Sequence, residues 1–124
     1  MSTTANIDLT NELYTLPDRL AEARAVLLQA SNGLTHAQDR LRREKARIAR
    51  MVTAERGEDG KPVYTNETAR NAAIEDILDT DGYGLQVALE EAQRAKDEAT
   101  LELQHRQDTF AALRAIARLV GNDG

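Results

Sequence analysis

Four arginines are spaced so that they fall on one face of a helix: Arg40, Arg43, Arg47 and Arg50. Residues three and four apart on a helix lie on the same side of it. The surrounding stretch, residues 40–56, has seven basic and two acidic side chains, hence a net charge of +5. A row of guanidinium groups is suited to binding phosphates, and such binding weakens as salt rises. The stripe is therefore a candidate surface for nucleic acid or for a protein partner.

Internal neutralisation is the competing explanation for this stripe. Residues 67–98 carry nine acidic against three basic side chains, and an antiparallel hairpin would bring them near the arginines. No aromatic residue stands among the arginines, so nucleic-acid bases have no side chain there to stack on. We favour neutralisation and keep a nucleic-acid accessory factor of the recombination type as the alternative function.

Metal chemistry and catalysis have little support in the sequence. Glu102 and His105 have the Glu-x-x-His spacing of di-iron bundles, and His36 would lie at the same level of a hairpin. A complete di-iron set needs further inward carboxylates and a second such motif, and both histidines flank the apolar stripe. We interpret them as surface histidines and expect no metal and no cofactor.

Nucleophilic and phosphate-loop chemistry are also unsupported. The chain has no cysteine, which excludes a thiol nucleophile and thiolate metal sites. The stretch from Gly57 to Lys61 lacks the Gly-x-x-x-x-Gly-Lys-Ser/Thr pattern of a phosphate loop, and no strand precedes it. We expect no catalytic residues and predict that the chain is not an enzyme.

A second candidate recognition surface lies around the turns in the middle of the chain. It comprises Tyr64, Asn66, Glu67, Arg70 and Tyr83. An exposed aromatic side chain beside an arginine is a common composition at binding hot spots. The same side chains are equally suited to packing the turn region, and both interpretations stay open.

Composition indicates long helices. Of the 124 residues, 41% are hydrophobic, 30% are charged and only 3% are aromatic, and the abundant residues are good helix formers. No signal peptide and no apolar run of about 20 residues is visible. We therefore expect a cytoplasmic protein that does not bind membranes. The net charge of −5 predicts no overall attraction to nucleic acid, which leaves only a local basic patch to bind it.

Heptad spacing predicts two long helices that each present one apolar seam. In the first helix, two rows alternate by three and four residues: Leu13, Leu20, Leu27, Leu34, Leu41 and Ile48, with Leu16, Ala23, Ala30, Ala37 and Met51. The last helix carries Leu85, Leu89, Ala92, Ala99, Leu103, Phe110, Leu113, Ala117 and Val120. The first row keeps its phase across Gly33, which favours one helix there.

Turn and cap signals set the predicted boundaries. Residues 1–14 are expected to be a flexible N-terminus, and residues 15–121 a single helical hairpin domain. Thr15 is a candidate cap for a helix over 16–56. The tip, 57–84, contains a short helix over 66–79 capped by Thr65 or Asn66. The last helix spans 85–120, with Gly121 as its C-cap. The predicted fold is an all-α antiparallel hairpin, a coiled coil with a short helix at its tip.

The hairpin is expected to associate, because a bare pair of helices leaves much of each apolar stripe in water. The simplest completion is a dimer that forms a four-helix bundle. Packing of the short tip helix back onto the long pair is the monomeric alternative.

The segment Tyr64-Thr-Asn-Glu-Thr-Ala-Arg70, followed by Ala72, Ala73 and an acidic turn, resembles an arm of small helical proteins found in phages and prophages. In those proteins a long helix follows the arm and ends in a Phe-x-x-Leu-Arg-like stretch, matched here by Phe110 to Arg114. The resemblance covers about half of the chain. It implies a coiled-coil protein from recombination or early host-takeover genes, acting in the host cytoplasm.

The hairpin with a polar tip is also similar to the coiled-coil arm of transcript-cleavage factors, with Glu58 and Asp59 as tip acids. The globular docking domain of that family has no counterpart here. The sequence therefore favours a non-enzymatic interaction protein, a phage-encoded inhibitor or adaptor that binds a protein partner.

Overall fold

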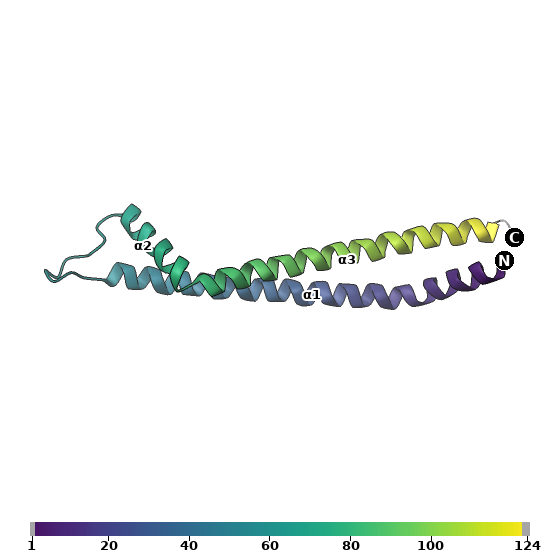
Figure 1. Ribbon diagram of the computed structural model, residues 1–124, viewed down its shortest axis with the longest axis horizontal. Coiled ribbons are helices and arrows are strands. Elements are labelled where there is room, and N and C mark those ends of the chain that lie inside the picture. The colour runs from purple at the N-terminus through teal and green to yellow at the C-terminus, as the bar shows by residue number, and fades with distance from the viewer. Residues whose placement is uncertain (1, 123–124) are drawn as a thin grey trace. The chain divides into compact units, whose positions relative to one another are not determined.

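The structure, a computed structural model, describes the backbone of residues 2–122 and the side chains of residues 9–121. Its three helices are α1 (Ser2–Ala54), α2 (Glu67–Thr80) and α3 (Tyr83–Asn122) (Figure 1). The long helices α1 and α3 pack antiparallel, with α2 between them in the chain, so the predicted all-α helical hairpin is confirmed. None of the described helices is long and apolar enough to cross a bilayer.

The chain divides into two units. We call residues 2–31 together with 94–122 the terminal unit, and residues 32–93 the turn unit. Each contains part of α1 and part of α3, and α2 belongs to the turn unit.

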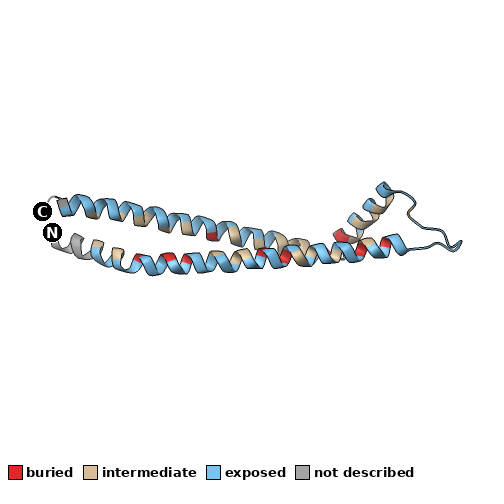
Figure 2. Cartoon of the chain, turned by 180° about the vertical axis from the view of Figure 1, so that it is seen from behind, coloured by how far each residue is buried: buried red, intermediate tan, exposed pale blue. Residues whose placement is uncertain are grey.

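The seam of the terminal unit follows the predicted heptads. Leu16, Leu20 and Ala23 of α1 and Ala99 of α3 are buried, and further heptad positions of both helices are half-buried. Figure 2 shows the buried positions as a broken line along one side of α1, whereas most of the surface of α3 is exposed. The unit thus buries one narrow stripe on each helix.

The predicted start of the first helix at residue 16 is wrong, because α1 begins at Ser2 and residues 2–14 are helical. Thr15 does not act as a cap. Its hydroxyl donates to the carbonyl oxygens of Asn11 at 3.1 Å and Glu12 at 3.3 Å, back along the same helix. Pro17 lies inside α1, where its lack of an N–H group removes one backbone hydrogen bond. The heptad rows of leucine nevertheless continue on both sides of Pro17.

The last helix is longer than predicted at both ends. It begins at Tyr83 instead of residue 85, and it continues through Gly121 to Asn122, so Gly121 is not its C-cap. Val120 was predicted to lie in the seam, but its side chain is exposed. The chain enters α3 directly from Gly82, whose carbonyl accepts from the N–H groups of Leu85 and Gln86 at 3.0 and 3.1 Å.

A short hairpin turn leads out of α1. The Val63 N–H donates to the Glu55 carbonyl at 3.2 Å, the Gly57 N–H to Lys61 at 2.9 Å, and the Gly60 N–H to Gly57 at 2.9 Å. Gly60 has a φ of +76°, a left-handed conformation that glycine adopts without steric cost. Residues 57–62 form a loop within the predicted tip, and Pro62 forms an isolated β-bridge with Arg56.

The core of the turn unit joins α1 to α2. Ile48, Val52 and Leu78 are buried there, packed against half-buried Leu41, Tyr64, Ala73, Ile74 and Ile77. Met51, predicted for the seam, is 46% exposed, and Val52 takes its place. The buried face of α1 is rotated here relative to the heptad rows, because α2 covers a different side of the helix. A strict seven-residue repeat also drifts by about 20° per heptad around a straight helix.

Two glycines of the turn unit have opposite environments. α1 is helical through Gly33, as predicted, and a Cβ atom there would meet nothing within 4 Å. Gly82 is buried between α2 and α3, and a Cβ atom there would lie 3.0 Å from both the carbonyl oxygen and Cδ2 of Leu78. The carbonyl cannot move without breaking its hydrogen bond from the Gly82 N–H. A side chain at position 82 would therefore require Leu78 to shift by a few tenths of an ångström.

We predict that Gly82→Ala lowers the free energy of unfolding by about 1–3 kcal/mol, because the added methyl group overpacks the turn. The matched variant Gly33→Ala should raise it by about 1 kcal/mol, since alanine is the better residue in an open helix position. Urea unfolding followed by helical circular dichroism measures both. A loss of stability in both variants would contradict the difference drawn between the two sites.

Candidate interaction surfaces

A groove runs beside the seam of the terminal unit, between α1 and α3. Two hollows that share Val26 and Glu102 make it up. The residues that line it are Arg19, Glu22, Ala23, Val26, Gln29 and Ala30 of α1 and Ala95, Glu98, Ala99, Glu102 and Arg106 of α3. We call this surface the alanine groove. Its floor is made of small apolar side chains, which let a neighbouring helix approach closely.

The α3 side of the groove continues as a second heptad row. Starting from Ala95, alternating steps of four and three residues reach Ala99, Glu102, Arg106, Thr109, Leu113, Ile116 and Val120. The row is apolar at both ends and polar in the middle. A helix that packs against a single neighbour needs only one seam, whereas a helix inside a bundle carries an apolar stripe about three positions wide in seven. α3 has the wider pattern.

Charged side chains of the groove pair along their own helices. The Arg106 Nε donates to Glu102 Oε1 at 2.8 Å, and the Arg19 Nη1 lies 3.4 Å from Glu12 Oε2. Such partly exposed pairs contribute little to stability.

Several large apolar side chains of the terminal unit are exposed. Leu101 is 70% exposed, Leu119 66% and Val26 54%. Tyr14, Leu28, Ile116 and Val120 belong to the same set. Single exposed apolar residues are ordinary on a protein surface, but here they surround a seam with few buried residues. The terminal unit thus has more apolar surface than its two helix segments cover.

The arginine stripe of the turn unit lies on the side of α1 that faces away from the core. At about 100° per residue, the four arginines centre about 140° around the helix from Leu41, Ile48 and Val52. Arg40, Arg43, Arg47 and Arg50 are all exposed. The structure therefore brings the four predicted stripe residues together on one face.

Internal neutralisation accounts for only one member of the stripe. Arg47 Nε donates to the two Glu44 carboxylate oxygens at 3.1 and 3.2 Å, and Asp81 adds a weaker attraction. Within the described part of the chain, Arg40, Arg43 and Arg50 have no carboxylate within 4.0 Å. From the acidic stretch, Glu75 approaches Lys45 at 3.9 Å.

The Glu44–Arg47 pair changes the titration of both groups. Hydrogen bonds from Arg47 lower the pKa of the Glu44 carboxyl, and the same bonds raise the pKa of Arg47. Because the folded pKa of Glu44 is lowered, the pair stabilises the fold above the ordinary carboxyl pKa. That contribution is lost as the pH falls through the lowered pKa.

We predict that Arg47→Gln moves the titration midpoint of Glu44 upward, toward the value of an ordinary glutamate. Carboxyl NMR chemical shifts followed against pH measure it. Arg43→Gln, which removes a charge from the same stripe but no hydrogen bond to Glu44, is the control. An equal upward movement in both variants would show that the general field, and not the hydrogen bond, sets the pKa.

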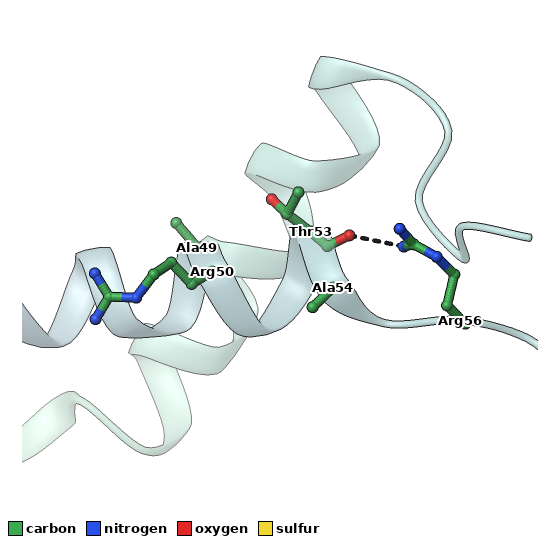
Figure 3. A pocket seen from close by; sticks show the side chains of 5 residues that line it. All are labelled: Ala49, Arg50, Thr53, Ala54 and Arg56. Carbon is green, nitrogen blue, oxygen red and sulfur yellow. Dashed lines mark hydrogen bonds between the residues drawn. The ribbon is translucent and has the colours of Figure 1, made fainter.

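A surface hollow lies at the end of α1, between Arg50 and Arg56 (Figure 3). Ala49, Thr53 and Ala54 form its floor. The Arg56 Nη1 donates to the carbonyl oxygens of Thr53 at 2.9 Å and Glu55 at 3.2 Å. These bonds hold the guanidinium in place and leave its other N–H groups available.

The candidate tip residues have different surroundings. Tyr64 packs against the core of the turn unit, and the Asn66 side chain accepts from the Ala69 N–H at 2.7 Å as the N-cap of α2. Glu67 is exposed in the first turn of α2, Arg70 is half-buried, and Tyr83 is 63% exposed. Tyr64 and Asn66 thus have structural roles, and Tyr83 presents an aromatic ring to solvent.

We predict that Asn66→Ala lowers the free energy of unfolding by about 1 kcal/mol, since the Ala69 N–H loses its acceptor. Asn66→Asp should retain stability, because its carboxylate accepts the same bond. Thermal unfolding of both variants provides the measurement, with exposed Thr65→Ala as the neighbouring control. A loss in Asn66→Asp equal to that in Asn66→Ala would argue against the cap.

The histidines do not belong to a metal-binding group within the described residues, where no three histidine or carboxylate side chains gather. His36 and His105 are exposed, as expected for surface histidines. Glu102, the other half of the Glu-x-x-His spacing, is bonded to Arg106.

The comparisons with known proteins assign no family to the chain. No family model, no curated protein and no solved structure matches it. The alanine groove and the arginine stripe are therefore the candidate functional surfaces of the chain.

The alanine groove was not identified from the sequence as a surface. The signal was present in the spacing of Ala23, Val26 and Ala30 with Ala95 and Ala99. Alanine at these positions lets the two helices approach each other closely. In the structure several of these alanines also line an open groove beside the seam, because two helices cover only one side of each other.

Proposed function

We propose that this chain is a non-catalytic interaction protein and that it binds a second copy of itself through the alanine groove. Two hairpins laid groove to groove form a four-helix bundle. The observation that carries the proposal is the second heptad row of α3, in which Ala99 is buried in the seam and Leu113 is half-buried, but Ala95, Ile116 and Val120 remain exposed in the terminal unit. Burying each fully exposed leucine or valine side chain contributes about 1.5–3 kcal/mol.

The accessible surface of the chain also supports association. It measures 9152 Å², whereas a folded monomer of 13.7 kDa exposes about 6,600 Å². The excess, about 2,500 Å², is larger than the total surface buried in a standard interface of about 1,600 Å². One additional hairpin offers the helical surface needed to cover it.

Charge complementarity favours two identical copies facing in opposite directions. Arg19 and Arg106 line one end of the groove, and Glu22 and Glu102 lie about one helical turn away. A twofold axis between these two levels places the arginines of one copy opposite the glutamates of the other. A twofold axis is the commonest symmetry of protein dimers and uses the same patch on both copies.

An inhibitor or adaptor role fits the same surface. A helix of another protein in the alanine groove would replace the second copy, and a module of this kind needs no catalytic residue to block or join its partners. The resemblance to phage and prophage helical proteins adds the proposal that a phage encodes this chain and that it acts in the host cytoplasm.

We predict that the chain in solution has twice the mass of one copy, and that Val26→Glu weakens the dimer at least about tenfold, a change of 1.4 kcal/mol or more. The substitution places a charge on the floor of the groove, where a partner helix would bury it. Sedimentation equilibrium over a range of concentrations measures the dissociation constant.

Ala25→Glu is the matched control. Ala25 is exposed and adjacent in sequence, but it points about 100° away from Val26 and does not line the groove. It should leave the dissociation constant within a factor of about two. A monomeric wild type, or equal weakening by both substitutions, would contradict docking in the groove.

A further inference from the structure

We infer that the outer face of α1 in the turn unit is a binding site for the phosphate backbone of duplex nucleic acid. The site comprises Arg40, Arg43 and Arg50, continued by Arg56 at the end of the helix. It lies in a different unit from the alanine groove and does not depend on self-association.

The three stripe arginines are available for a ligand. They are exposed, and within the described residues no carboxylate lies within 4.0 Å of them. Arg47, between them, has Glu44 as its counterion and contributes less. A guanidinium has five N–H donors in a planar fork that matches two phosphate oxygens.

The helix α2 and the arginine stripe lie on different sides of α1. α2, which holds Glu67, Glu75, Asp76 and Asp79, packs on the core side of α1, where Glu75 approaches Lys45 at 3.9 Å. Asp81 attracts Arg47 weakly, and none of the described carboxylates lies within 4.0 Å of Arg40, Arg43 or Arg50. The net charge of −5 for the whole chain thus hides a locally basic surface.

Arg56 extends the site past the last turn of α1. Two backbone carbonyls hold its guanidinium beside a hollow whose other edge is Arg50 (Figure 3). A guanidinium already held in place loses less conformational entropy when it binds a ligand. In Figure 3 the guanidinium groups of Arg50 and Arg56 lie at opposite ends of the hollow, so each presents its own N–H groups to a ligand.

The residue types of the face select the ligand. No aromatic residue occurs in residues 40–56, so stacking on bases, which single-strand binding uses, has no platform. From Arg40 to Arg50 the stripe is about 15 Å long, and a duplex has one phosphate charge per about 1.7 Å of its axis. Several phosphates therefore lie within reach of the row at once. Such a site contacts the phosphate backbone and does not distinguish one base sequence from another.

Fluorescence anisotropy with a labelled duplex of about 30 base pairs tests the inference on the full-length chain. With four phosphates neutralised, the slope of log affinity against log salt should be about −3.6, so binding weakens about 50-fold between about 50 and 150 mM salt. The variant Arg40→Gln, Arg43→Gln, Arg50→Gln should bind at least tenfold more weakly at low salt, with a slope near about −0.9 because Arg56 is retained.

The control removes the same number of charges elsewhere, by Arg24→Gln, Arg94→Gln and Arg118→Gln, which are exposed positions of the terminal unit. It should bind within about threefold of wild type, because the stripe is intact. Circular dichroism confirms that both variants are helical. Absence of binding by wild type at low salt would overturn the inference, as would equal losses in the two variants.

Two competitors determine the class of ligand. Unlabelled single-stranded DNA should displace the duplex less effectively than unlabelled duplex does, and polyglutamate should displace it less effectively still. Polyglutamate as effective as duplex would show that the face binds acidic protein segments, and stronger competition by single strands would exclude the duplex as the preferred ligand.

Discussion

Two helices can bury only one stripe on each other, and every other property of this molecule follows from that geometric limit. A helix has about 3.6 residues per turn. A partner on one side therefore covers the residues that are spaced alternately three and four apart, and it leaves the other residues in water. In the terminal unit this limit yields a seam of leucine and alanine with few fully buried members. The turn unit escapes it locally, because α2 adds a third helix and closes a small core around Ile48, Val52 and Leu78.

The two units therefore offer different surfaces for different physical reasons. In the terminal unit the uncovered side includes the alanines of the groove and large exposed apolar side chains such as Leu101 and Ile116, so another helix can displace water from it. In the turn unit α2 occupies the apolar side of α1, and the side that remains is the one where arginines recur. Apolar and basic surfaces thus belong to separate lengths of the same helix, and each can be altered by substitution without touching the other.

Particular residues show which structural features could be predicted from the sequence and which could not. The heptad rows identified Leu16, Leu20 and Ala23, and the cap preference identified Asn66, because both depend on local helix geometry. Met51 was assigned to the seam by the same periodicity and is exposed, since the arrival of α2 moved the buried face to Val52. Thr15 has the residue type of a cap but lies inside α1. Side-chain chemistry alone does not distinguish a cap from a hydroxyl bonded back along the helix.

The sequence by itself determined the helices, the turn with its left-handed Gly60, and the face on which the arginines lie, because each depends on interactions between residues close together in the chain. Only the tertiary structure decided which carboxylates reach which arginines, that a side chain at position 82 would crowd Leu78, and that alanines of α1 and α3 line one open groove. Those facts depend on distances between residues far apart in the chain. The spacing of residue types along a helix sets the direction of a side chain, but the neighbouring helix determines what that side chain meets.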